Sequence, residues 1–196
     1  MAVAIAVAKD GEIAVGHDTC WGYDQTPDGR VRVIRLGQHD KSLGLVVASN
    51  APVGVADVLF DALRGIIEGY GPGVWRKEWT RYCCSPDDPI FGGLRLSDEG
   101  IPYELLVVMD GKMHVAVTDG GAFERREVAT IGPDWEKAAG AAQALLAHRP
   151  DMTADEVVQF AIKVTSSIAE TTNPEVRTVV ITDDLEGLVP PLDLEE

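Results

Sequence analysis

The sequence predicts an α+β fold in which two antiparallel sheets are covered by helices on their outer faces, a four-layer αββα sandwich. Three observations lead to this prediction. The chain contains two blocks of apolar, strand-like segments, and each block includes a hairpin signal at an Asp-Gly pair. Each block is followed by residues with the period of an amphipathic helix. This order of elements suits two sheets that pack on each other and carry helices outside.

The first block is predicted to hold four strands. Residues 2–8 and 12–17 flank Asp10-Gly11, where glycine tolerates the positive φ angle that a short hairpin turn requires. Residues 31–36 and 43–49 are two further apolar stretches. The period then changes, and one helical face collects Val55, Val58, Leu59, Ala62, Leu63, Ile66 and Ile67 before Gly69.

Residues 70–102 are rich in glycine, proline and aromatic residues and show no clean period. A segment of this length in a compact domain is usually functional or interfacial, or it contains short helices that the pattern does not resolve. We therefore predict a long irregular insertion here.

The second block repeats the plan of the first. Residues 103–109 and 113–118 flank Asp110-Gly111, and residues 127–131 are predicted to add a strand. Two helices (134–148 and 153–171) and a closing strand (177–182) follow, and the sequence from Thr153 to Glu156 matches a capping box. We expect one domain over residues 1–182, followed by an acidic tail, 183–196, that is either a solvated terminus or a docking peptide.

Charge and cysteine content limit the classes of partner. The chain has 17 basic and 32 acidic residues, and its net charge of −15 disfavours nucleic acid and anionic membrane surfaces. The longest apolar run, residues 2–8, is too short to span a bilayer and lacks the pattern of a secretory signal. Three cysteines do not resemble a disulfide framework. We therefore expect a cytoplasmic protein.

Residues 1–18 resemble the start of the HslV peptidase and of proteasome β subunits, including the hairpin Gly11 and the acidic Asp18. Further similar segments follow in the same order: 130–132, 138–146, 151–156 and 172–173. The resemblance covers roughly residues 1–69 and 103–182. It implies the fold of the N-terminal-nucleophile hydrolases, which is the αββα sandwich that the pattern predicts.

The resemblance also implies where the catalytic residues would stand. Enzymes of this class attack with the side chain of their own first residue, whose free α-amine serves as the base. The nucleophilic threonine falls on Ala2, and the lysine falls on Arg32. The serine and glycine loop reads Gly132-Pro133-Asp134-Trp135, the second acidic position falls on Ser167, and Asp18 is retained. No catalytic set is therefore intact, although Asp18 also suits a structural role as a strand-end carboxylate bonded to backbone amides.

The leading hypothesis is a proteasome-like subunit that lacks the nucleophile and serves a structural or regulatory role in a ring. Relatives of this family form six- or seven-membered rings, often with a ring-shaped ATPase, so the resemblance implies a homo- or hetero-oligomer with subunit contacts near helices 55–68 and 134–148. The alternative is an active threonine-type peptidase whose nucleophile is substituted or unrecognised here. A third hypothesis is a ligand-binding module that reuses the vacated pocket around Asp18 and Arg32.

Other chemistry finds less support in the sequence. His17, Cys20, Cys83 and Cys84 are soft ligands, but the paired C-x-x-C spacing of zinc sites is absent. Processing that exposed Thr19 or Cys20 as a new first residue would remove a whole hairpin from the sheet. No Walker-type or dinucleotide signature occurs, so we expect no metal and no cofactor.

Overall fold

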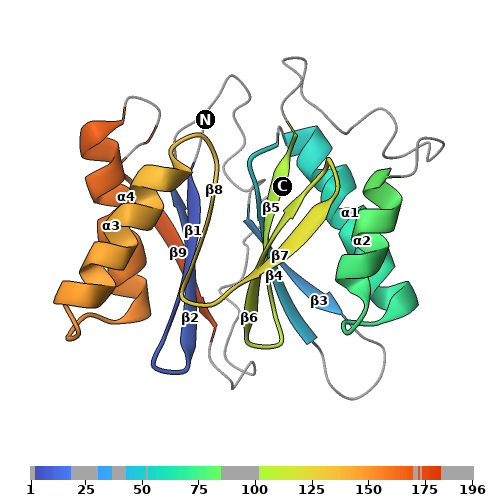
Figure 1. Ribbon diagram of the computed structural model, residues 1–196, viewed down its shortest axis with the longest axis horizontal. Coiled ribbons are helices and arrows are strands. Elements are labelled where there is room, and N and C mark those ends of the chain that lie inside the picture. The colour runs from blue at the N-terminus through green and yellow to red at the C-terminus, as the bar shows by residue number, and fades with distance from the viewer. Residues whose placement is uncertain are drawn as a thin grey trace, which may run out of the picture.

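The computed structural model is a sandwich of two antiparallel sheets between two pairs of helices (Figure 1). It describes residues 3–18, 31–36, 43–51, 53–84, 102–169, 172 and 174–181, with side chains at all of these except 31–36, 43–46, 53 and 84. The first sheet has the order β8 (Val128–Ile131), β1 (Ala4–Lys9), β2 (Glu12–Asp18), β9 (Val176–Ile181). The second sheet has the order β3 (Val31–Leu36), β4 (Leu43–Ser49), β5 (Glu104–Met109), β6 (Lys112–Val117), β7 (Gly121–Arg125). The helices are α1 (Val53–Tyr70), α2 (Trp75–Cys84), α3 (Trp135–His148) and α4 (Ala154–Ile168).

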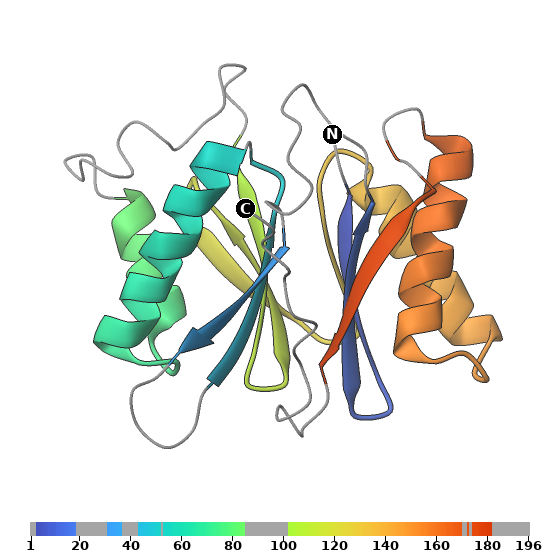
Figure 2. The same cartoon turned by 180° about the vertical axis from the view of Figure 1, so that it is seen from behind.

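Successive side chains along each strand point to opposite faces of the sheet, and this alternation produces the layers. Ala4, Ala6 and Val15 of the first sheet meet Leu106 and Val108 of the second sheet in a core between the sheets. The opposite face of the second sheet packs on α1 and α2, and that of the first sheet packs on α3 and α4. Figure 2 shows the same order of layers from behind. The predicted α+β sandwich is therefore confirmed.

Both predicted Asp-Gly hairpins are present. Asp10 and Gly11 have φ angles of 52° and 84°, and Asp110 and Gly111 have φ angles of 51° and 65°. Positive φ at both central residues is the requirement of a two-residue hairpin turn that follows the strand twist. The two turns lie at the bottom of Figure 1, and we call the opposite end of both sheets the upper end.

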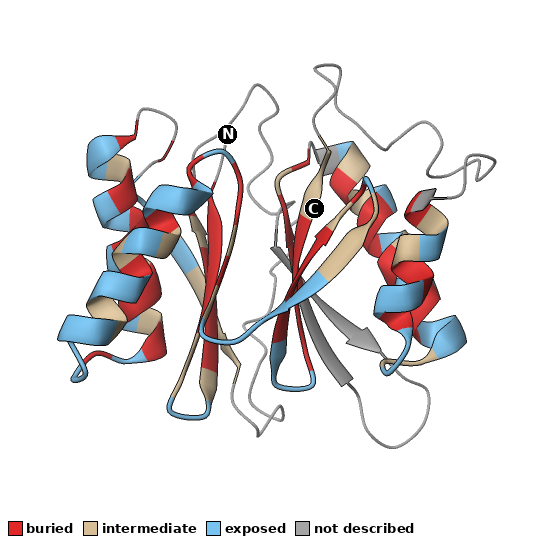
Figure 3. Ribbon diagram, in the orientation of Figure 1, coloured by how far each residue is buried: buried red, intermediate tan, exposed pale blue. Residues whose placement is uncertain are grey.

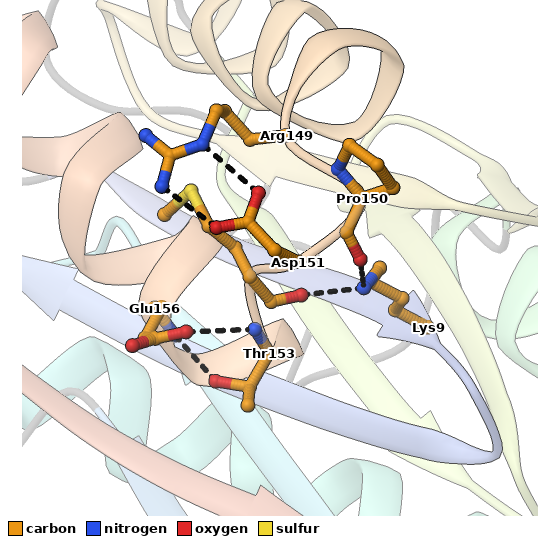
Figure 4. A network of polar contacts seen from close by, with 7 residues as sticks. Lys9, Arg149, Pro150, Asp151, Thr153 and Glu156 are labelled. Carbon is orange, nitrogen blue, oxygen red and sulfur yellow. Dashed lines mark hydrogen bonds and ion pairs between the residues drawn. The ribbon is translucent and has the colours of Figure 1, made fainter.

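The connection between α3 and α4 is held at three points (Figure 4). The ammonium group of Lys9 donates to the carbonyl oxygen of Pro150 at 2.8 Å and to that of Met152. Arg149 donates to both carboxylate oxygens of Asp151, which lowers the pKa of this exposed aspartate. The capping box predicted at Thr153 is confirmed, because its hydroxyl accepts the N–H of Glu156 and the glutamate accepts the N–H of Thr153. The capping box satisfies amides at the start of α4, and the bonds from Lys9 tie the α3–α4 connection to the end of β1.

Three elements differ from the prediction. Residues 75–84 of the predicted insertion are not irregular: they form α2, a short helix of the kind that the sequence pattern left unresolved, and α2 places Trp75, Trp79 and Cys83 in the core. These residues recur at every fourth position and so share one helix face, a period hidden by the polar residues between them. Strand β7 was not predicted, and α4 ends at Ile168 instead of Thr171 because Ala169 is extended. The remainder of the predicted insertion, 85–101, and the acidic tail lie outside the described residues.

Burial follows the layers, with buried residues on the strands and on the inward faces of the helices (Figure 3). None of the described helices is both long enough and apolar enough to cross a membrane.

Candidate functional site

Strand register gathers several predicted site positions at the upper end of the first sheet. Ala4 pairs with His17 on one side and with Ile131 on the other. The residues that come next at this end are therefore Val3, Asp18 and Gly132. This is the end of the sheet at which β1 begins, and Val3 links β1 to Ala2 in the sequence.

Asp18 is buried, with 1% of its surface exposed. One carboxylate oxygen accepts the backbone N–H of Val3 at 3.0 Å, and the N–H of Asp18 donates to the carbonyl of Val3 at 3.2 Å. The next residue back, His17, places Nδ1 2.8 Å from the carbonyl oxygen of Asp18. The carboxylate thus fixes the backbone immediately after Ala2, as the structural hypothesis for Asp18 predicted.

The loop between β8 and α3 begins at the same end of the first sheet, on the other side of β1 from Asp18. Gly132 has a φ angle of 98°, a conformation that side chains with a Cβ atom rarely adopt. Pro133 is exposed, whereas the carboxylate of Asp134 is buried and accepts Lys137 Nζ at 2.8 Å and the hydroxyl of Thr172 at 3.1 Å. This loop is therefore tied down at the start of α3 and by the segment that follows α4.

A carboxylate from the second sheet reaches the same loop. Glu104 Oε2 accepts the N–H of Gly132 at 2.9 Å and the side-chain amide of Asn50 at 3.0 Å. Asn50 Oδ1 accepts the N–H of Glu104 at 2.8 Å, and the N–H of Asn50 donates to the carbonyl of Glu104 at 3.3 Å. Burial raises the pKa of Glu104, and the bond from Gly132 lowers it by a smaller amount. We call Asn50, Glu104 and Gly132 the sheet clasp.

Sequence reasoning missed Glu104, although a signal was available. Glu104, Leu106 and Val108 alternate along β5 and share the face that meets the first sheet. A single carboxylate on an otherwise apolar, inward strand face needs a partner, because burying an unpaired charge is unfavourable. Gly132 as that partner was not predictable, because it lies 28 residues away on the other sheet.

Histidine and cysteine do not form a centre in the described part of the chain. No group of three or more His, Cys, Asp or Glu side chains there is arranged to hold a metal ion. Cys83 lies in the helical layer, with Sγ 3.8 Å from the carbonyl oxygen of Val117, whereas His17 belongs to the first sheet. His114 is buried edge-on against Trp75 with ring centroids 5.3 Å apart, and burial lowers its pKa. His114 thus packs as a structural, neutral side chain.

Comparison with solved structures decides the fold. HslV from Trypanosoma brucei has a TM-score of 0.69 at 15% identity, with 92% of this chain and 99% of that chain covered. The chain has the proteasome-like fold. Two other structures agree: BPH from Thiobacillus denitrificans in complex with epoxomicin (TM-score 0.65, 16% identity, 93% and 98% covered), and Anbu, an ancestral beta-subunit, from Yersinia bercovieri (0.61, 13%, 91% and 80%). No protein-family model and no curated protein matches the sequence.

Only some of the predicted site positions lie at the upper end of the first sheet in this proteasome-like fold. Asp18 and the Gly132–Pro133–Asp134 loop lie at the upper end, on either side of β1. Arg32 pairs with Val47 in the backbone register of β3 and β4, and its side chain lies outside the described residues, as does Ala2. Ser167 is exposed in the last turn of α4, where its hydroxyl donates to the carbonyl of Val164 at 2.6 Å.

Proposed function

We propose that this chain is a non-catalytic subunit of a proteasome-like ring. The observation that carries the proposal is Ala2, which follows Met1 and stands where the resemblance places the nucleophile. A methyl group has no oxygen or sulfur with which to attack an amide carbonyl. Arg32, Pro133 and Ser167 replace other members of the catalytic set, and an arginine does not substitute for lysine in a tightly packed site.

The retained Asp18 is consistent with a silent site. Its carboxylate holds the N–H of Val3 in the buried end of the first sheet. Losing that bond would leave a buried amide without this partner, which costs about 1–3 kcal/mol. Selection for folding alone therefore accounts for an aspartate at this position.

The test of catalysis is incubation with fluorogenic peptides and with epoxomicin, the compound present in the BPH complex. We expect no turnover and no mass increase of the intact chain, because no heteroatom is available at residue 2. The variant Ala2→Thr is also expected to remain inactive, since the other positions are altered as well. An active peptidase of the same fold is the positive control for the assay.

A stoichiometric adduct on the unmodified chain would refute the proposal and favour the alternative of an active threonine-type peptidase. If the Ala2→Thr variant cleaves the peptides and the unmodified chain does not, the other residues of the site are able to support catalysis.

The outer surface of α4 supports assembly into a ring. Phe160, Val164 and Ile168 recur at every fourth position and are 51%, 42% and 62% exposed. Because α3 and α4 form an antiparallel pair, the half-exposed Trp135 at the start of α3 lies at the same end as Ile168. An apolar stripe of this kind on a soluble surface is typical of an interface.

Charge favours a second copy of the chain, or a close relative, on this stripe. The net charge of −15 makes whole chains repel one another. The exposed charged residues along α3 and α4 include both signs: Glu136, Lys137, Glu156 and Lys163. Two acidic and two basic groups leave this surface without the acidic excess of the chain, so like copies can approach here. A ring-shaped ATPase would be a further partner, as the resemblance implies.

The variant Val164→Asp is expected to shift native mass spectra at micromolar concentration from the assembled form toward the monomer. Placing a carboxylate in the centre of an apolar interface requires burying an unpaired charge, which is strongly unfavourable. Lys112→Gln is the control, because it makes the same change in net charge at an exposed residue of the β5–β6 hairpin. A wild-type chain that is strictly monomeric would remove the ring proposal.

A further inference from the structure

We propose that Glu104 is a positioning residue that holds the Gly132–Pro133–Asp134 loop against the second sheet through a hydrogen bond whose strength follows the ionisation of its carboxyl group. The inference concerns the geometry of the site and does not depend on whether the subunit is silent.

The sheet clasp connects segments that are far apart in the chain. Asn50 follows β4, Glu104 begins β5, and Gly132 follows β8 in the other sheet. One oxygen of Glu104 receives donors from both of the other residues, at 2.9 and 3.0 Å. The backbone bonds between Asn50 and Glu104 extend the β4–β5 ladder and hold the glutamate in place. The rigid half of the clasp is therefore the second sheet.

The other half of the sheet clasp is the Gly132–Pro133–Asp134 loop, which moves when the bond to Glu104 weakens. Pro133 has no N–H to donate, and Asp134 is held from the side of α3 by Lys137. The N–H of Gly132 is consequently the donor that ties the first part of the loop to the second sheet. Ile131, the preceding residue, pairs with Ala4 of β1, so a shift of the loop is transmitted toward Val3 and Asp18.

Ionisation changes the strength of this tie. An N–H bond to a carboxylate is charge-assisted and about twice as strong as the same bond to a neutral acid. Burial holds the pKa of Glu104 above its ordinary value of 4.5, so protonation begins closer to neutral pH than for an exposed glutamate. The clasp is thus tight at neutral pH and weaker when the pH falls through the folded-state pKa.

Ionisation of Glu104 has the opposite effect on the stability of the whole fold. A carboxyl with a raised folded-state pKa contributes most to stability below pH 4.5, and this contribution is lost as the pH rises through the folded-state pKa. Ionisation of Glu104 therefore strengthens the hydrogen bond from Gly132 but lowers the free energy of unfolding.

Other charged or titratable groups lie on the elements around Glu104. In the described residues these include Lys9 of β1, Glu12, His17 and Asp18 of β2, Lys112 and His114 of β6, Asp119 after β6, and Asp134, Glu136 and Lys137 at the start of α3. Lys9 and Lys112 lie at the lower end beside the hairpin turns, and Asp134 is bonded to Lys137. Burial and the Gly132 bond are the causes of the pKa shift of Glu104.

The test is hydrogen–deuterium exchange of the peptide that spans Gly132, measured on the full chain from about pH 8 to about pH 4 and corrected for intrinsic exchange. In the wild type we expect the protection of the Gly132 amide to fall about fivefold as Glu104 takes up its proton. Glu104→Gln keeps an acceptor oxygen but cannot ionise, so its protection should be intermediate and independent of pH. Glu104→Ala should show low protection throughout.

Glu124→Gln is the matched control, because Glu124 is an exposed carboxylate on β7 of the same sheet. It should retain the wild-type pH dependence. The proposal is overturned if protection at Gly132 does not change with pH in the wild type, or if Glu104→Gln keeps the wild-type pH dependence. These two readouts decide the matter even if Glu104→Ala fails to fold.

Discussion

Replacing Trp79 with alanine is expected to lower the free energy of unfolding by about 4 kcal/mol, measured by chemical denaturation. Trp79 is fully buried in α2 and packs in the core formed by α1, α2 and the second sheet. Its indole N–H donates to the carbonyl of Val117 at 3.2 Å. The substitution removes a large apolar surface, leaves a cavity and breaks this bond.

Tyr70→Ala is the control for this variant. Tyr70 is another aromatic residue of the segment predicted to be irregular, but it is 50% exposed at the end of α1. Its removal is expected to change stability by no more than about 0.5 kcal/mol. Similar effects of the two variants would contradict the placement of α2 in the core and would favour the interfacial interpretation of residues 70–102.

Replacing Gly16 with valine is expected to destabilise the fold by about 3 kcal/mol. A Cβ atom at Gly16 would lie 2.4 Å from Cγ1 of Val158 on α4, 3.0 Å from Cγ2 of Thr178 and 3.2 Å from the carbonyl oxygen of Arg177. Val158 is itself fully buried and β-branched, so it has little freedom to move. The helix would have to shift away from β2, and the packing of α4 on the first sheet would be lost.

Gly140→Ala, in the helical layer that contains α4, is expected to raise the free energy of unfolding, whereas Gly16→Val lowers it. Gly140 lies on the exposed side of α3, and nothing lies within 4 Å of the Cβ atom it would gain. Alanine in a helix interior is favoured over glycine by roughly 0.5–1 kcal/mol, so this variant should be more stable than the wild type. A stabilising Gly16→Val in the same denaturation experiment would show that α4 does not approach β2 as closely as the structure places it.

Local patterns predicted most of the elements. The two Asp-Gly turns, the apolar strands around them and the capping box at Thr153 each depend on residues that are neighbours in the chain. Such features can be recognised without knowing the fold, because their hydrogen bonds and φ angles are local. Helix α2 was not predicted because it has only ten residues and polar residues stand between its core residues Trp75, Trp79 and Cys83.

The candidate site was predictable only in part. The order of similar segments pointed to the fold and to Asp18, and the register of β1 with β2 and β8 places Asp18 and the Gly132 loop at the same end of the first sheet, on either side of β1. Glu104 was not predicted, because its partner Gly132 follows a strand of the other sheet, and Asn50 was not predicted, because its partner Glu104 lies 54 residues away in the chain. Ser49 and Thr118 are also buried at strand ends, where their hydroxyl groups accept the N–H groups of Ala51 and Tyr103.

The sequence by itself determined the identity of the atoms at each position, above all the methyl group of Ala2, and the periods that define strands and helices. Only the tertiary structure decided which distant groups meet. Valine at residue 16 illustrates the difference: strand propensity favours it, whereas Val158 excludes it. The physical reason is that propensity acts between chain neighbours, while close packing and the pairing of buried polar groups are set by how the layers fit together.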